Sequence, residues 1–187
     1  MSRALWMAIG LSLALVAPGV WAHKASDGYL TLERHESAVT GRLDLALRDL
    51  ELAIGLDSDA DGAITWGELK SRRGQIEDYA LSRLGLATEG HACTSEATGQ
   101  RVDRHTDGAY AVIDFVAHCD NAPALTLRYT VLHEVDPQHR GLVRYLDARG
   151  AARSFVLSAQ APETTFATEH DVMAQSMKFA REGVHLI

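Results

Sequence analysis

Most of the chain after residue 22 consists of short segments in which apolar and polar residues alternate. In the clearest of them, Val39–Arg48, Leu43, Leu45 and Leu47 fall on one face. A period of two is typical of a strand with one buried face. The same alternation occurs in Tyr29–Arg34, Ala109–Cys119, Leu125–Val131, Leu142–Asp147 and Ser154–Leu157. The pattern predicts a mainly β fold, either an antiparallel β-sandwich or an open barrel, with Tyr29–Arg34 and Val39–Arg48 as a hairpin.

Two segments interrupt this rhythm with helical spacing. Trp66–Leu86 places Leu69, Ile76 and Leu84 on one face, which predicts an amphipathic helix, and Asp49–Leu56 before it is long enough for one or two helical turns. We therefore expect a helical insertion at about 49–88. A second helix is expected near the end, within residues 161–187, after a linker that contains Pro162.

The first 22 residues have the pattern of a secretory signal peptide. Arg3 supplies a positive charge, Ala4–Val16 is apolar, and Val20–Ala22 ends on a small residue suited to cleavage. The apolar segment is short for a membrane span, although an uncleaved anchor is the alternative. Cleavage predicts an exported protein, periplasmic or otherwise extracytoplasmic, that begins at His23 and has its β-rich domain at 23–160.

Composition excludes several functions. The net charge is −7 and no run of basic residues exists, so we expect no nucleic-acid partner. A mean hydropathy of −0.09 is too polar for a protein with several membrane spans. Two cysteines are too few for a cysteine zinc cluster. In an oxidising compartment Cys93 and Cys119 are expected to form a disulfide, with two buried thiols as the alternative.

The strongest functional signal is the twelve-residue segment Asp57–Glu68, which fits the EF-hand loop at every defining position. Gly62 stands at position 6, where the chain turns sharply, and Ile64 at position 8 is apolar. The expected metal ligands, at positions 1, 3, 5, 7, 9 and 12, are Asp57, Asp59, Asp61, Ala63 through its carbonyl, Thr65 and Glu68.

These ligands predict a Ca²⁺ site. Calcium takes six to eight oxygen ligands, and four carboxylates this close repel one another without a cation. A chance acidic turn that caps the following helix is the alternative. Only one such loop is present, whereas calcium sensors use pairs, so we expect a structural ion rather than a switch.

Three stretches, one of which includes the end of this loop, resemble a known family. His23–Leu30, Leu45–Leu50 and Thr65–Leu69 are similar to the extracytoplasmic N-terminal region of HupE/UreJ-type membrane proteins, and Phe179–Ile187 resembles the approach to their membrane helices. The resemblance covers nearly all of the chain after residue 22, with motifs of moderate specificity. It implies a soluble β-rich domain that precedes a membrane bundle, in a family associated with nickel transport.

The residues that would carry transport are absent, so that activity does not transfer. The resemblance leaves two possibilities open: the sequence is part of a longer, membrane-attached protein with residues 161–187 beside the membrane, or it is a soluble relative. Its expected partner is a membrane domain or membrane protein, and no small-molecule substrate is indicated. The expected function is a non-catalytic calcium-binding domain.

Two alternative functions remain. Nine histidines allow a nickel- or copper-binding module. His23 at a cleaved terminus would offer its amine and ring to Cu²⁺, with His118 or His133 as a third ligand. His133–Pro137 begins like a zinc-protease motif, but its fifth residue is proline, which breaks the required helix. A hydrolase would need residues that no motif identifies, so we expect no enzyme.

Overall fold

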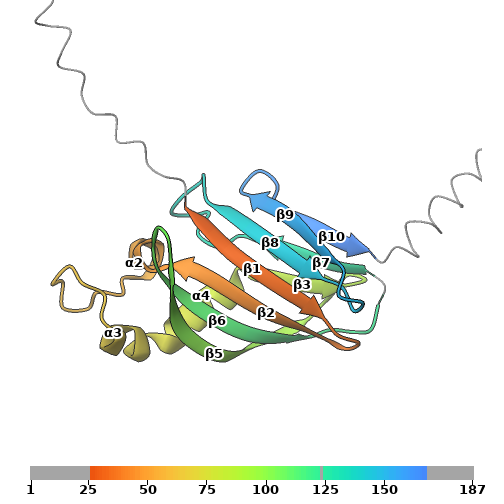
Figure 1. The fold of residues 1–187 in the computed structure, drawn as a ribbon, viewed down its shortest axis with the longest axis horizontal. Helices are drawn as coiled ribbons and strands as arrows, with labels where there is room; N and C mark the ends of the chain where they lie inside the picture. Colours follow the sequence, from red (N-terminus) through yellow and green to blue (C-terminus); the bar gives the residue numbers. More distant parts are fainter. Residues whose placement is uncertain (1–25, 123, 168–187) are drawn as a thin grey trace, which may run out of the picture.

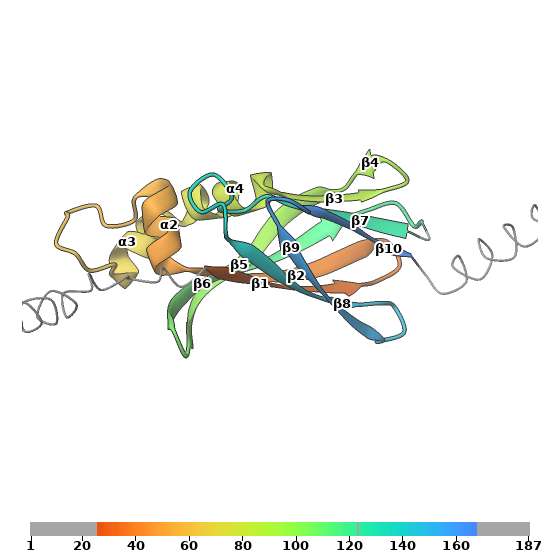
Figure 2. The same ribbon diagram turned by 90° about the horizontal axis from the view of Figure 1, so that it is seen from above.

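Two β-sheets facing each other form the body of the protein (Figures 1 and 2). The computed structural model describes residues 26–122 and 124–167. The six-stranded sheet has the order β5-β6-β2-β1-β8-β9, and the four-stranded sheet has the order β10-β7-β3-β4. The mainly β, sandwich-like fold expected from the alternating pattern is confirmed.

The strands of the large sheet are β1 (Asp27–Arg34), β2 (Ala38–Ala46), β5 (Thr94–His105), β6 (Gly108–His118), β8 (Arg140–Leu146) and β9 (Ala152–Ser158). Those of the small sheet are β3 (Leu84–Thr88), β4 (His91–Ala92), β7 (Ala124–Tyr129) and β10 (Glu163–Ala167). The helices are α2 (Leu47–Ile54), α3 (Trp66–Ser71) and α4 (Arg73–Ser82).

Alternating apolar residues of both sheets fill the space between them. Leu30, Leu43 and Ile113 come from the large sheet and Leu127 from the small one, and each is at most 1% exposed. The expected β1–β2 hairpin is present, with Leu30 opposite Leu43. Burial of these side chains provides the main free energy of folding, at about 25 cal/mol per Å² of apolar surface.

The large sheet is mixed rather than purely antiparallel. β1 pairs antiparallel with β2 but parallel with β8, where Tyr29 lies opposite Leu142. The parallel pair is possible because the small sheet supplies the long connection between β6 and β8. The expected antiparallel sandwich is therefore corrected at this one strand pair.

The predicted helix over Trp66–Leu86 is shorter and broken. It divides at Arg72 into α3 and α4 and ends at Ser82. Leu84 and Leu86 belong to β3, where exposed Gly85 separates the two buried leucines. Their spacing of two is a strand period that the longer helical window concealed.

Besides β3, the strands β4, β5 and β10 were not predicted. β5 forms an edge of the large sheet and consists mostly of exposed polar residues, so it lacks the apolar alternation that identifies a strand. β10 lies within the segment expected to be a linker, and it pairs with β7. The β-rich domain thus continues to Ala167, beyond the expected boundary at residue 160. The predicted signal peptide at 1–22, His23 and the last twenty residues of the segment 161–187, where a helix is expected, lie outside the described residues.

Candidate metal centre

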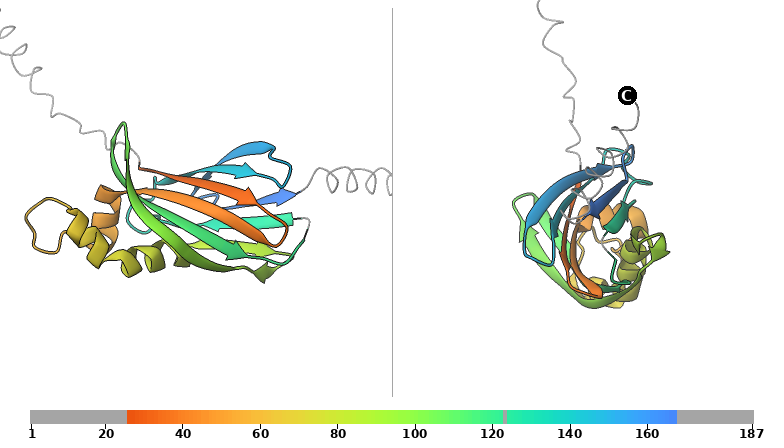
Figure 3. Two further views of the ribbon diagram at one scale, coloured as in Figure 1. Left: turned by 60° about the horizontal axis from the view of Figure 1, so that its bottom comes forward. Right: turned by 90° about the vertical axis from the view of Figure 1, so that its right-hand side faces the viewer.

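The acidic loop Asp57–Glu68 projects from one end of the sandwich, between α2 and α3 (Figure 3). Both of its ends are fixed to the body of the protein. Before the loop, Gly55 ends α2 with a left-handed backbone (φ +63°), and Leu56 is fully buried. After it, Leu69 is 3% exposed, and inside it Ile64 packs against the core. The loop is therefore held at two sides by apolar contacts.

Three of the predicted ligands converge. Carboxylate oxygens of Asp57, Asp59 and Asp61 lie within 4.8 Å of one another. Each carboxylate also accepts a backbone N–H of the loop: Asp57 Oδ2 from Gly62 (2.8 Å), Asp59 Oδ1 from Asp61 (3.3 Å) and Asp61 Oδ1 from Ala63 (2.8 Å). These bonds fix the carboxylates and leave each of them a second oxygen.

One carboxylate oxygen of this cluster is buried without a hydrogen bond among the described residues. This oxygen is Oδ1 of Asp57. An unsatisfied buried carboxylate oxygen is costly, and a bound cation removes that cost. This atom belongs to position 1 of the predicted loop, so the residues present fit a hard cation such as Ca²⁺.

Glu68, the predicted ligand at position 12, lies outside the converging group. Its Oε1 accepts from the Ser58 N–H (2.7 Å) and hydroxyl, and its Oε2 accepts from the Thr65 N–H (2.9 Å) and hydroxyl. The hydrogen bonds from Thr65 and Ser58 lower the pKa of Glu68 to about 2. The carboxylate thus stays charged and connects the two sides of the loop.

Thr65 contributes in a second way. Its hydroxyl accepts the N–H of Glu68 (3.3 Å), while Glu68 accepts the N–H of Thr65, which forms a capping box at the start of α3. The remaining predicted ligand, Ala63, lies in the exposed part of the loop. The segment therefore supplies the N-terminal cap of a helix in addition to the predicted metal ligands.

Glu51 on α2 was not identified from the sequence. Its Oε2 accepts the backbone N–H groups of Leu56 and Asp57, the latter at 2.7 Å. The sequence does not indicate that this glutamate, six residues before the loop, contacts the loop backbone, because only the turn at Gly55 brings the backbone back to its side chain.

The two cysteines form a disulfide, as predicted. Cys93 precedes β5 and Cys119 follows β6, and their Cα atoms are 4.6 Å apart. The bond joins segments 26 residues apart at the end of one hairpin. Neither cysteine belongs to the acidic loop.

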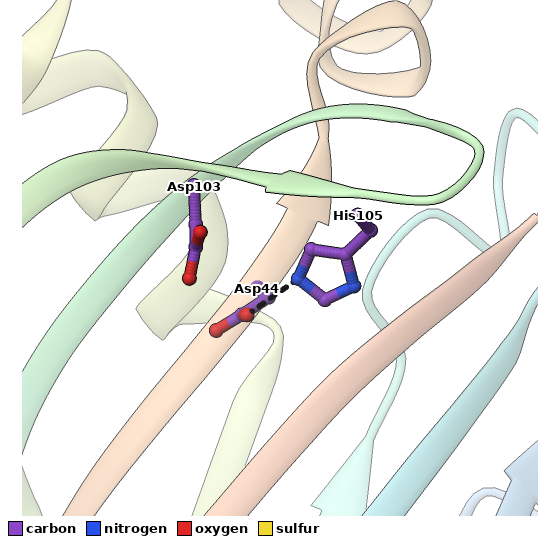
Figure 4. Close-up of side chains that lie close together, drawn as sticks. All are labelled: Asp44, Asp103 and His105. Atoms are coloured by element: carbon purple, nitrogen blue, oxygen red, sulfur yellow. Dashed lines mark hydrogen bonds and ion pairs between the residues drawn. The ribbon is translucent and has the colours of Figure 1, made fainter.

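A second cluster, which the sequence did not suggest, lies on the large sheet and contains Asp44, Asp103 and His105 (Figure 4). Asp44 is buried, and its Oδ2 is 3.0 Å from His105 Nε2. Arg42 already donates to both oxygens of Asp44 (2.7 and 2.8 Å) and to Asp103 (2.7 Å). Because the guanidinium of Arg42 bridges both carboxylates, the cluster is an ion-pair network.

The histidines considered for a transition-metal site do not all meet. His118 is exposed and faces Glu96, and His105 belongs to the Arg42 network. His133 and His139, by contrast, lie with ring centroids 6.1 Å apart. Within the described ranges, His133 Nε2 is buried without a hydrogen-bond partner.

His139 is fully buried and joins distant parts of the chain. Its Nδ1 is 2.5 Å from the Ser26 hydroxyl, and its Nε2 is 2.8 Å from the Tyr129 hydroxyl. Burial lowers the pKa of His139 to about 4, so the ring is neutral at physiological pH. Burial also raises the pKa of Asp49, which contacts the same serine from α2.

Comparison with models of protein families and with curated protein sequences gave no match for the chain. Over residues 26–122 and 124–167, none of the helices has the length and apolar character needed to cross a membrane.

Proposed function

We propose that this protein is an exported, non-catalytic domain that binds one Ca²⁺ ion in the loop Asp57–Glu68. The buried Oδ1 of Asp57 carries the proposal, because it lies beside Asp59 and Asp61 and has no hydrogen-bond partner among the described residues. All six expected ligands offer oxygen, which suits calcium. Magnesium prefers a tighter octahedron and keeps several waters.

The proposed role of the ion is structural. Leu56 and Leu69 hold the two sides of the loop in the core, so binding would leave the position of the helices largely unchanged. The gain would be the stability that any ligand confers when it binds the folded state alone. The disulfide supports export, since such bonds persist in oxidising compartments. The sequence resemblance supports placing the domain outside the membrane bundle of a HupE/UreJ-type protein, or as its soluble relative.

Calorimetric titration of the exported protein, after treatment with a chelator, tests the proposal. We expect one Ca²⁺ per chain and much weaker binding of Mg²⁺. Asp59→Asn should weaken calcium binding strongly, while Asp78→Asn, on an exposed position of α4, should leave it unchanged. Absence of calcium binding, or equal binding by both variants, would refute the proposed function.

A transition-metal site is the second candidate, and one observation favours it. His133 Nε2 is a nitrogen ligand that, in the part of the chain described, is buried and unpartnered. It lies near His139, which contacts Ser26, three residues after the predicted first residue His23. Cu²⁺ titration of the exported protein tests it. His133→Ala should weaken Cu²⁺ binding, whereas His118→Ala should not, and the affinity should not depend on whether the acidic loop is intact. One added N-terminal residue should also weaken it. Equal affinities would exclude the site.

The structure offers little support for a hydrolase. Ser26 and His139 resemble a nucleophile and its base, but they are 3% and 0% exposed, and Tyr129 closes the other side of the ring. A substrate needs access to both groups.

A further inference from the structure

Between α2 and the first predicted ligand, the side chain of Glu51 bonds to two successive peptide groups. The backbone N–H of Gly55 bonds to the carbonyl of Glu51 (2.9 Å), which ends the helix. The next two N–H groups, of Leu56 and Asp57, both bond to Oε2 of the same Glu51 (2.7 Å for Asp57). One carboxylate oxygen therefore fixes two successive peptide groups.

This arrangement determines where the Asp57 carboxylate lies. Leu56 is fully buried, so its side chain and its N–H are both fixed. The backbone of Asp57 is bonded to Glu51, and its Oδ2 is bonded to Gly62 (2.8 Å). With these points fixed, Oδ1, which has no hydrogen-bond partner in the described part of the chain, has little freedom except to face the cluster formed with the other loop carboxylates.

We propose that Glu51 is a positioning residue that raises calcium affinity without touching the ion, by holding Asp57 in its ligand geometry before binding. The inference rests on the proposed calcium function. Glu51 precedes the twelve-residue loop, and its Oε2 accepts the N–H groups of Leu56 and Asp57, so it acts through the backbone and not as a ligand. A loop that is already ordered loses less conformational entropy when the ion binds.

Two variants separate this role from a simple effect of negative charge. Glu51→Gln keeps an acceptor oxygen at the same reach and removes the charge. Glu51→Asp keeps the charge and shortens the side chain by one methylene, which takes the carboxylate away from the two N–H groups. Glu77→Gln is the matched control, because Glu77 is a glutamate of the same insertion that pairs with Arg73 on α4.

The measurement is calcium affinity of the exported protein by calorimetry. Trp66, the single tryptophan after residue 22, gives a second readout from within the loop by its fluorescence. We expect Glu51→Asp to bind about tenfold more weakly, the equivalent of one charge-assisted hydrogen bond, and Glu51→Gln to stay within about threefold of the natural protein. Glu77→Gln should bind as the natural protein does.

The reverse order, with Glu51→Gln weak and Glu51→Asp normal, would show that charge alone matters and would overturn the inference. Equal affinity of all forms would overturn it too. Circular dichroism in chelator shows whether each variant is folded, and a variant that folds only with calcium supports the inference, since its loop is then ordered by the ion. If the natural protein binds no calcium, the proposed function itself is refuted. If it binds calcium but Glu51→Asp is not weaker than Glu51→Gln, only the role of Glu51 is refuted.

Discussion

Asp57→Asn is the substitution that tests the calcium site most directly. The asparagine can keep a carbonyl oxygen at the position that accepts the Gly62 N–H, so the loop backbone stays bonded. An uncharged amide nitrogen then takes the place of the buried Oδ1, which has no partner among the residues described, so the cluster loses one anionic ligand. We expect the variant to fold and to lose most of its calcium-dependent stability.

The magnitude follows from linkage. When calcium is present at about 100 times its dissociation constant, binding stabilises the folded state by about 2.7 kcal/mol. For a domain of this size, that corresponds to a rise in melting temperature of roughly 5–10 °C. If losing a ligand charge weakens affinity about a hundredfold, the same calcium concentration stabilises the variant by only about 0.4 kcal/mol, or roughly 1 °C.

Thermal unfolding by circular dichroism, with calcium and with chelator, measures both shifts. Asp78→Asn is the control, because it makes the same change at an exposed position of α4 outside the loop. Calcium should raise its melting temperature as much as that of the natural protein. If calcium raises the melting temperature of Asp57→Asn as much as that of the natural protein, the ligand assignment is wrong. If calcium shifts neither protein, the site does not bind the ion.

Three further results are expected. Thiol titration of the exported, denatured protein should find no free thiol, and replacing Cys93 and Cys119 by serine should lower stability by roughly 3–4 kcal/mol without loss of calcium binding; two reactive thiols would contradict this. Between pH 6.5 and about 4 an unfolded histidine takes up a proton that buried His139 does not, because its pKa is lowered, so stability should fall as the pH falls. Asp49, whose pKa is raised by burial, has the opposite effect on stability. The measurement is therefore the difference in free energy of unfolding between the natural protein and His139→Gln. A difference that stays constant across this pH range would contradict the effect. Mass spectrometry of the exported protein should give a chain that begins at His23; a retained segment 1–22 would contradict cleavage.

The strands with one buried face could be predicted from the sequence, because burial itself requires the alternation. Leu43 and Leu45 in β2, and Ile113 and Phe115 in β6, are nearly fully buried, as their spacing indicated. β5 could not be predicted in this way. It is an edge strand, stabilised by its backbone bonds to β6, and such bonds place little demand on the side chains.

Helix boundaries depended on tertiary contacts. The spacing of Leu84 fits a helical face and a strand equally well. The segment forms strand β3 because its backbone pairs with that of β7, where Leu84 lies opposite Tyr129. The parallel β1–β8 pair likewise joins residues more than 100 positions apart. No local pattern records such a pair.

For the candidate site, the sequence by itself determined the predicted ligand types and their order, since the segment matches a contiguous loop pattern whose spacing sets its geometry. It also determined which two cysteines are available to pair. Only the tertiary structure decided that Asp57 Oδ1 lacks a partner among the described residues, and that Glu51 reaches back to hold Asp57. It alone also buried His139 between Ser26 and Tyr129. The physical reason is that ligand spacing is a local property of the chain, whereas burial and the partners of a polar atom depend on segments that only folding brings together.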